Sequence, residues 1–204
     1  MAVKIPVQDE PKLAPPGAGI PLLARLLVRY VVILLQTRNA SWERSIKLFE
    51  KEGSRILQAV ERREPNELEA RMLVDPIRGL EDSSRFWSVH MTLEHLMIVG
   101  NGMGDIIVKL SNGETLSMVV RTAEVKPQGL ESSKVILERY SAFMKELPLR
   151  IQSKLGDLNS KTTHPHPWFG PLTAKQWLWL LGVHQNIHRV QIQAIFNAMK
   201  SAKG

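Results

Sequence analysis

Cysteine is absent from the 204 residues of this chain. Without cysteine, the protein has no disulfide framework, no thiolate metal ligand and no thiol nucleophile of its own. The same absence fits a reducing compartment, and we expect a cytoplasmic location. Any metal that this protein binds must therefore be held by histidine and oxygen ligands.

Aromatic residues are scarce, at 6% of the chain, although the formal net charge is +7. A cationic surface can bind nucleic acid by displacing counterions from the phosphates. Here the charges are interspersed, since the pair Arg62 and Arg63 is followed at once by Glu64. No RNA-stacking or DNA-reading motif accompanies them. We therefore expect a mixed, solvated surface and no nucleic-acid partner.

Long uninterrupted apolar runs are also missing. The most apolar stretch, residues 20–36, is interrupted by Arg25 and Arg29 and falls short of the roughly 20 residues that a bilayer crossing needs. We expect no integral membrane span. Because Arg25, Arg29 and Gln36 follow helical spacing, the stretch predicts an extra N-terminal apolar helix with one narrow polar stripe. It suits packing on the rest of the protein, a homodimer contact, or a peripheral membrane or interaction surface.

The first 19 residues lack the charged-then-apolar layout of a signal peptide. They are polar and contain Pro6, Pro11, Pro15 and Pro16, which predicts a flexible, proline-rich tail. The whole chain is 44% hydrophobic, and its length suffices for one sizeable core but not for two. We therefore expect residues 20–204 to form a single domain.

Four further segments carry apolar residues at three- and four-residue steps, the pattern of amphipathic helices. They cover residues 42–62, a stretch from Asp82 or Ser83 past Ile106, residues 131–155, and Thr173 to about Lys200. Pro148 should kink or divide the third helix, and Thr173 with Gln176 forms a capping box for the fourth. Residues 114–129 lack helical periodicity and form a long connection between the second and third helices. The sequence predicts an all-α four-helix bundle.

Two histidines occupy core positions of the fourth predicted helix. His184 and His188 lie on the inward seam between Leu181 and Ile195. A four-residue step places two side chains on one face, about 5 to 6 Å apart at their Cβ atoms, so both imidazoles can reach one ion. Two histidines can equally line a core seam with hydrogen bonds alone, so the pair needs a third ligand.

His95 supplies this candidate third ligand. It lies on the inward stripe of the second predicted helix, between Met91 and Ile98, so three of the six histidines take positions that would otherwise suit leucine. Two buried neutral imidazoles can hydrogen-bond to each other, but a third leaves nitrogens unsatisfied. A divalent ion uses all three lone pairs. We therefore predict a metal site at His95, His184 and His188.

Two segments of the chain resemble the DinB-like superfamily. They are Trp87-Ser-Val-His-Met-Thr-Leu-Glu-His95, and the stretch from His166-Pro-Trp-Phe-Gly-Pro-Leu-Thr-Ala-Lys-Gln-Trp177 to His184-Gln-Asn-Ile-His188. The resemblance covers residues 42–198 and implies a four-helix bundle with one histidine ligand on the second helix and a His-x-x-x-His pair on the fourth. These ligands match His95, His184 and His188. Where the related sulfoxide synthases have an acidic residue two places after the pair, this chain has Val190.

The resemblance implies thiol-dependent transferase or isomerase chemistry, and a three-histidine site leaves a coordination position open for water or substrate. Zinc, nickel or ferrous iron suits such a site. We expect a metal-dependent enzyme of thiol-transferase or hydrolase type that acts on a small molecule and takes any thiol from an external low-molecular-weight co-substrate. A non-catalytic metal- or ligand-binding bundle is the main alternative.

Acid or base partners are harder to predict. Tyr140 on the third helix and Glu94 next to His95 are the candidate catalytic residues. His90 lies about 140° around the helix from His95, so it cannot share the ion, and we expect it to pair with Glu94. His164 and His166 alternate with prolines in a predicted rigid turn before the fourth helix.

Overall fold

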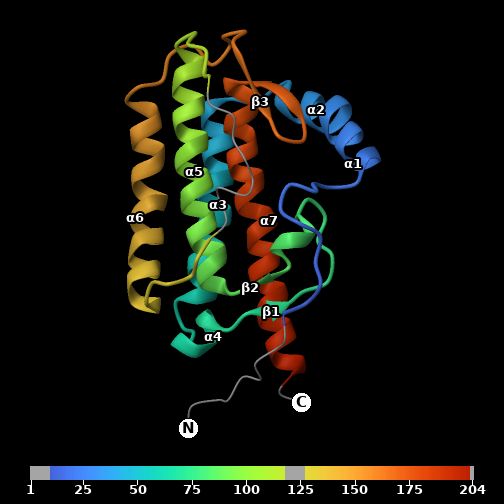
Figure 1. Ribbon diagram of the computed structural model, residues 1–204. Coiled ribbons are helices and arrows are strands. Elements are labelled where there is room, and N and C mark those ends of the chain that lie inside the picture. Colours follow the sequence, from blue (N-terminus) through green and yellow to red (C-terminus); the bar gives the residue numbers. More distant parts are fainter. Residues whose placement is uncertain (1–9, 118–126, 203–204) are drawn as a thin grey trace.

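Four long helices form the body of the protein in the computed structural model, which describes residues 10–117 and 127–202. They are α3 (Trp42–Val60), α5 (Val89–Ser111), α6 (Ser133–Gln152) and α7 (Ala174–Ser201). Helix α7 packs against α3 and α5, and α6 packs against α5 and α3, so the four helices close around one core (Figure 1). The predicted four-helix bundle is confirmed.

The amphipathic pattern of α3 shows why these segments are helical. Ile46, Phe49, Ile56 and Val60 recur at helical spacing, and all four are buried. The helix begins after Ser41, whose hydroxyl accepts a hydrogen bond from the backbone N–H of Arg44 at 3.3 Å, as an N-cap residue should. The apolar stripe therefore faces the core while the cap fixes where the helix starts.

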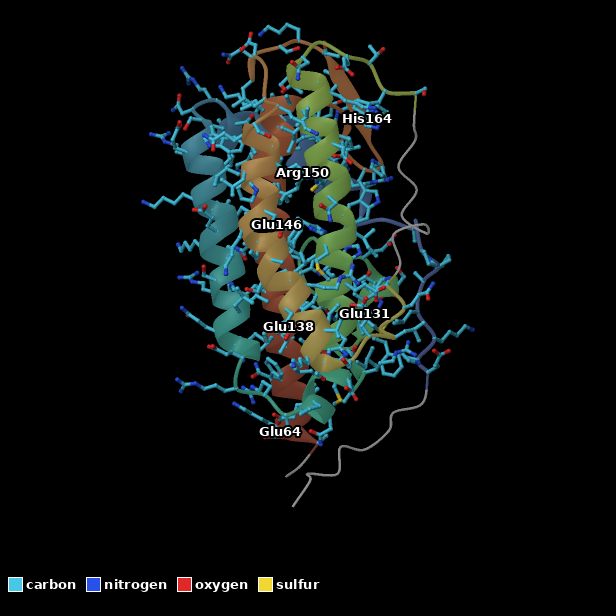
Figure 2. All side chains as sticks on the ribbon, turned by 90° about the vertical axis from the view of Figure 1, so that its left-hand side faces the viewer. Glu64, Glu131, Glu138, Glu146, Arg150 and His164 are labelled. Atoms are coloured by element: carbon cyan, nitrogen blue, oxygen red, sulfur yellow. The ribbon has the colours of Figure 1, made fainter. Side chains whose placement is uncertain are left out.

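Charged side chains cover the outer faces of the bundle. On α6, Glu138 and Glu146 are exposed, and Figure 2 shows them along the length of this helix with Arg150. Pro148 does not divide α6, which runs as one helix from Ser133 to Gln152. Its neighbours Leu147 and Ile151 are 2% and 1% exposed, and their burial offsets the roughly 3 kcal/mol that an interior proline costs.

Helix α5 begins later than the sequence predicted. Ser88 is its N-cap and accepts a hydrogen bond from the backbone N–H of Met91 at 3.1 Å. The predicted caps lie instead in a short 3₁₀ turn, η2 (Asp82–Ser84), followed by strand β2 (Phe86–Trp87). This strand pairs antiparallel with β1 (Met72–Leu73), which follows the short helix α4 (Pro65–Glu69). The pairing holds Trp87 in extended backbone and so delays the helix.

Helix α7 begins where the sequence predicted. The Gln176 side chain accepts the backbone N–H of Thr173 at 2.9 Å, as part of a capping box. The segment before it is a β-hairpin of strands β3 (Thr163–His166) and β4 (Gly170–Thr173), where the sequence suggested only a rigid turn. The hairpin places His164 opposite Leu172, and both are buried.

An extra apolar helical segment precedes the bundle, as predicted. It consists of α1 (Leu22–Leu27), the π-helical turn η1 (Val28–Val32) and α2 (Ile33–Thr37), and it lies on the outside of the bundle beside β3 (Figure 1). Within the described parts of the chain, no helix is long and apolar enough to cross a membrane.

Two predicted segments fall partly outside the described residues. Of the proline-rich tail, the first nine residues lie outside, whereas the backbone N–H groups of Ala14 and Gly17 donate to Asp82 and Glu81 at 2.7 Å. The predicted flexibility of the tail and the division of the chain at residue 19 stay predictions. Residues 118–126 of the long connection also lie outside the described part.

Candidate metal centre

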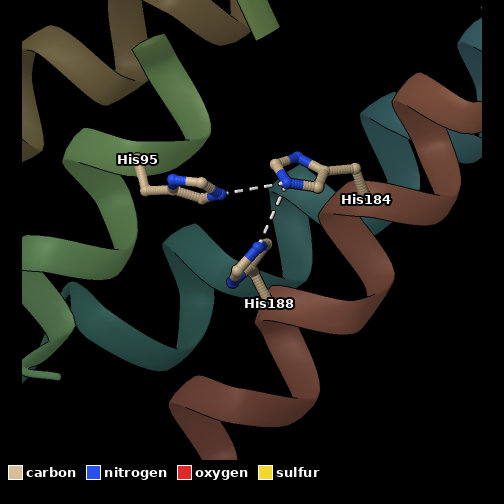
Figure 3. A group of neighbouring side chains, drawn as sticks. All are labelled: His95, His184 and His188. Atoms are coloured by element: carbon tan, nitrogen blue, oxygen red, sulfur yellow. Dashed lines mark hydrogen bonds between the residues drawn. The ribbon is translucent and has the colours of Figure 1, made fainter. Parts of the chain in front are cut away.

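Helices α5 and α7 bring three histidines together inside the bundle. His95 extends from α5, and His184 and His188 extend from successive turns of α7 toward it (Figure 3). The Nε2 atom of His184 lies 3.2 Å from Nε2 of His95 and 3.1 Å from Nε2 of His188. The three nearest ligand nitrogens all lie within 4.8 Å of one another.

These distances suit a shared divalent ion. Zinc binds imidazole nitrogen at about 2.0 to 2.1 Å, so nitrogens of one tetrahedral site are separated by about 3.3 Å. The two printed Nε2 separations, 3.1 and 3.2 Å, are close to that value. The donor set of three imidazoles therefore fits a metal of the kind predicted from the sequence.

The orientation of His188 is fixed by two residues behind it. Its Nδ1 lies 2.7 Å from Oε1 of Gln191, and the amide nitrogen of Gln191 donates to the backbone carbonyl of Ser84 at 2.7 Å. The bond from Gln191 to Ser84 identifies the nitrogen of the Gln191 amide, so the atom facing His188 is the amide oxygen, which can only accept. Nδ1 of His188 must therefore carry the proton and donate it. Nε2 of His188 then presents its lone pair to the other two histidines, the arrangement expected behind a metal ligand.

Hydrogen bonding among the histidines cannot satisfy both close contacts equally well. The lone pair of His188 can accept a proton only if Nε2 of His184 carries one. In that tautomer, the single N–H group of His184 lies within hydrogen-bond distance of both His188 and His95 and cannot serve both contacts fully. In the other tautomer of His184, two lone pairs face each other at 3.1 Å. A cation at the centre accepts all three lone pairs at once and removes this conflict.

Aromatic and apolar side chains surround the three imidazoles. The ring of Trp87 lies 5.0 Å from that of His95 and stacks parallel to that of His188 at 6.2 Å. Leu181 is 1% exposed, and it lies one turn before His184 on α7. His188 is buried, whereas His95 and His184 are only half-buried. The cluster is therefore largely enclosed, with some solvent exposure at His95 and His184.

Burial keeps His184 and His188 neutral. Loss of contact with water lowers the pKa of His184 well below its ordinary range, and positive charge on His188 or His95 would lower it further. Burial and the proximity of His95 lower the pKa of His188 to about 3, although the bond to Gln191 acts in the opposite direction. Neutral imidazoles have the free lone pairs that metal binding needs.

These shifts predict that the metal-free protein is acid-sensitive. The folded-state pKa of His188, about 3, lies below the value of about 6.5 for an unfolded chain. Protons therefore bind the unfolded state first as the pH falls, and stability decreases from about pH 6.5 toward pH 3. After chelation, the thermal midpoint should fall between pH 7 and pH 4, and less steeply in His188→Gln. An equal slope in the two proteins would contradict the assigned shift.

The two predicted acid–base groups are placed differently. The Tyr140 hydroxyl is fully buried and donates to Oε1 of Gln185 at 2.6 Å, and burial raises the pKa of this phenol. The Glu94 carboxylate accepts the backbone N–H groups of Gln128 and Gly129 at 2.9 and 2.6 Å. Glu94 thereby holds the described end of the long connection against α5.

Several sequence predictions around the site need correction. His90 does not pair with Glu94, because both of its ring nitrogens are buried without a hydrogen-bond partner among the described residues. Ile98, which we placed on the inward stripe of the same helix as His95, is 39% exposed. His95 lies in the three-histidine cluster, on a helix whose N-cap, Ser88, is six residues after the predicted cap Asp82.

His166 lies close enough to influence the site. Its ring stacks on Phe169 with 4.6 Å between ring centroids and lies 5.3 Å from the ring of Trp177. The backbone N–H of Trp168 donates to its Nδ1 at 3.1 Å. Burial lowers the pKa of His166 to about 3, and its charge would depress the pKa of His184. Hairpin β3–β4 therefore contributes a neutral imidazole to the surroundings of the three histidines.

The model of the DinB family matches residues 37–199. The chain belongs to the DinB family. The match includes α3, α5, α6, all but the last two residues of α7, and all three site histidines, and it begins only at the last residue of α2. The family resemblance predicted from the two histidine-containing segments is thus confirmed, together with the bundle that it implied.

A solved structure supports the four-helix fold. The crystal structure of TT2238, a four-helix bundle protein, has a TM-score of 0.50 and 23% sequence identity, with 76% of this chain and 99% of that chain covered. At this level of identity, the likeness concerns the fold alone. Among curated proteins, no significant match was found.

Proposed function

We propose that this DinB-family protein is a divalent-metal-dependent enzyme of thiol-transferase or hydrolase type that acts on a small molecule. His95, His184 and His188 are its proposed metal ligands. The observation that carries the proposal is the convergence of three imidazole nitrogens, with separations of 3.1 and 3.2 Å about His184, on a partly accessible side of the bundle. A purely structural core seam would have no need of a third histidine.

Three protein ligands leave room for an exchangeable ligand, as in catalytic zinc sites, and zinc, nickel and ferrous iron all suit imidazole donors. Bound there, such an ion lowers the pKa of a water or thiol and polarises a carbonyl. Since the chain has no cysteine, a thiol must come from an external low-molecular-weight co-substrate.

The chain's own residues orient the ligands and limit access of water. Gln191 keeps the lone pair of His188 directed inward, and Trp87 and Leu181 are almost fully buried beside the imidazoles. Tyr140 and Glu94 remain the proposed acid–base groups. The raised pKa of Tyr140 means that its phenol keeps its proton, which suits a donor and not a base.

The proposal is tested with cobalt-loaded protein and small thiols. We expect each productive thiol to produce a sulfur-to-metal charge-transfer band, because a thiolate is a better ligand than water for such ions, and to be transferred to a generic electrophile. His184→Ala should show neither effect. A cobalt spectrum that responds to hydroxamates but to no thiol would favour the hydrolase type, and a lack of turnover with either class would favour a non-catalytic metal-binding bundle.

A further inference from the structure

The N-terminal helical segment, α1 to α2, exposes its apolar face. The large hydrophobic residues on that face are between 43% and 81% exposed, and we call them the outer apolar face: Leu22, Leu23, Leu26, Leu27, Tyr30, Val31, Leu34 and Leu35. By contrast, Ile33 and Thr37 on the inner side are 1% and 6% exposed. Contiguous exposed apolar surface of this kind marks an interaction site in soluble proteins.

Two arginines of the segment's polar stripe lie toward the protein. Arg25 and Arg29 are half-buried. A Cβ atom placed on Gly170 of the hairpin would lie 2.7 Å from a guanidinium nitrogen of Arg29, and one placed on Gly19 would lie 3.6 Å from a guanidinium nitrogen of Arg25. The arginines thus pack beneath the segment. Packing against the bundle, which we allowed from sequence, does not account for the outer leucines.

The π-helical turn helps to keep the outer apolar face straight. The residues of the outer apolar face come in adjacent pairs, and successive pairs are four positions apart. In an ideal α-helix, each four-residue step rotates about 40° beyond a full turn. A stripe of this spacing would wind around the helix. The turn over Val28–Val32 is wound more loosely, with i→i+5 hydrogen bonds, and offsets part of the drift. The result is one continuous face along the segment.

The local charge identifies the kind of surface that covers this face. Between Glu10 and Glu43 the chain has no acidic residue, whereas it has Lys12, Arg25, Arg29 and Arg38. A second copy docked on the same face would bring two cationic segments together without any compensating carboxylate. An anionic lipid surface complements both the leucines and the cations.

We propose that the outer apolar face binds an anionic membrane surface, with the segment lying in the plane of the membrane. The 16 residues from Leu22 to Thr37 span about 24 Å as a helix, less than the roughly 30 Å hydrocarbon core. Leucines on the outer side enter the boundary between headgroups and acyl chains, and the exposed side chains of Lys12 and Arg38 supply cations for the anionic headgroups. The segment lies before the DinB match except for its last residue, so it adds this property to the family bundle.

The test compares two variants of the full chain that lose equally exposed leucines. Leu23→Ser with Leu35→Ser removes side chains that are 81% and 67% exposed on the outer apolar face, and Leu130→Ser with Leu149→Ser removes side chains that are 82% and 66% exposed elsewhere. Both variants should remain folded, because no buried contact is removed. Thermal unfolding by circular dichroism verifies this.

Co-sedimentation with phosphatidylcholine vesicles, with and without phosphatidylglycerol, gives the result. We expect the unaltered protein and the Leu130/Leu149 variant to bind the anionic vesicles with the same affinity. The Leu23/Leu35 variant should bind them at least about tenfold more weakly. Binding should also weaken as salt increases. Failure of the unaltered protein to bind, or equal losses in both variants, overturns the proposal. A dimer that only the Leu23/Leu35 variant disrupts, without vesicle binding, would assign the face to a second copy.

Discussion

His184→Ala should abolish stoichiometric metal binding and leave the bundle folded. Nε2 of His184 is the nitrogen that contacts both other site histidines, at 3.2 and 3.1 Å, so its removal breaks the ligand set at its centre. Loss of groups that only orient a metal ligand weakens binding 10- to 100-fold, and loss of the ligand itself should exceed about 100-fold. His95→Ala should behave in the same way.

Metal content by mass spectrometry and circular dichroism of each variant test this prediction, on protein purified without an affinity tag. His90→Ala is the matched control, since His90 is also a buried histidine of α5 but lies outside the cluster. It should retain one metal per chain. The helical signal should persist in every variant, because bundle packing and not the ion holds most of the fold. Full metal content in His184→Ala would disprove the site.

Arg189→Ala should be strongly destabilising, although Arg189 has no proposed role in metal binding and only follows His188 of the candidate site. Its Nε donates to the carboxylate of Glu52 at 2.5 Å, and the Glu52 side chain is only 3% exposed. Removing one partner of a buried ion pair leaves the other charge without compensation, which costs about 3 to 5 kcal/mol. We expect about 3 kcal/mol, because Arg55 still contacts Glu52 at 3.0 Å.

Arg150→Ala is the control for this second prediction. Arg150, seen on α6 in Figure 2, also pairs with a carboxylate, that of Asp105 at 2.7 Å, but its partner is 60% exposed. An exposed ion pair contributes at most about 1 kcal/mol. Chemical denaturation of the two variants should therefore differ by about 2 kcal/mol or more in the free energy of unfolding. Similar losses of unfolding free energy in the Arg189 and Arg150 variants would mean that Glu52 is solvated when Arg189 is removed.

Much of the fold could be predicted because the relevant information is local. Helical periodicity identified four helices, and the capping box at Thr173 and Gln176 gave the start of α7. The start of α5 was wrong for an equally physical reason. Asp82 and Ser83 are as suitable for capping as Ser88, and only the pairing of Phe86 and Trp87 with a distant strand decided among them.

The candidate site could likewise be predicted only in part from local sequence information. By itself, the sequence determined which groups are available to hold a metal: there is no cysteine, and histidines take core positions of two helices, which helical spacing places on the inward faces. Only the tertiary structure decided how they are oriented, because the bond from Gln191 to Ser84 joins residues 107 positions apart. The same holds for the N-terminal helix. Its composition determined that one side is apolar, but packing decided that this side faces away from the bundle, since a pattern within one helix cannot specify which of its faces another element will cover.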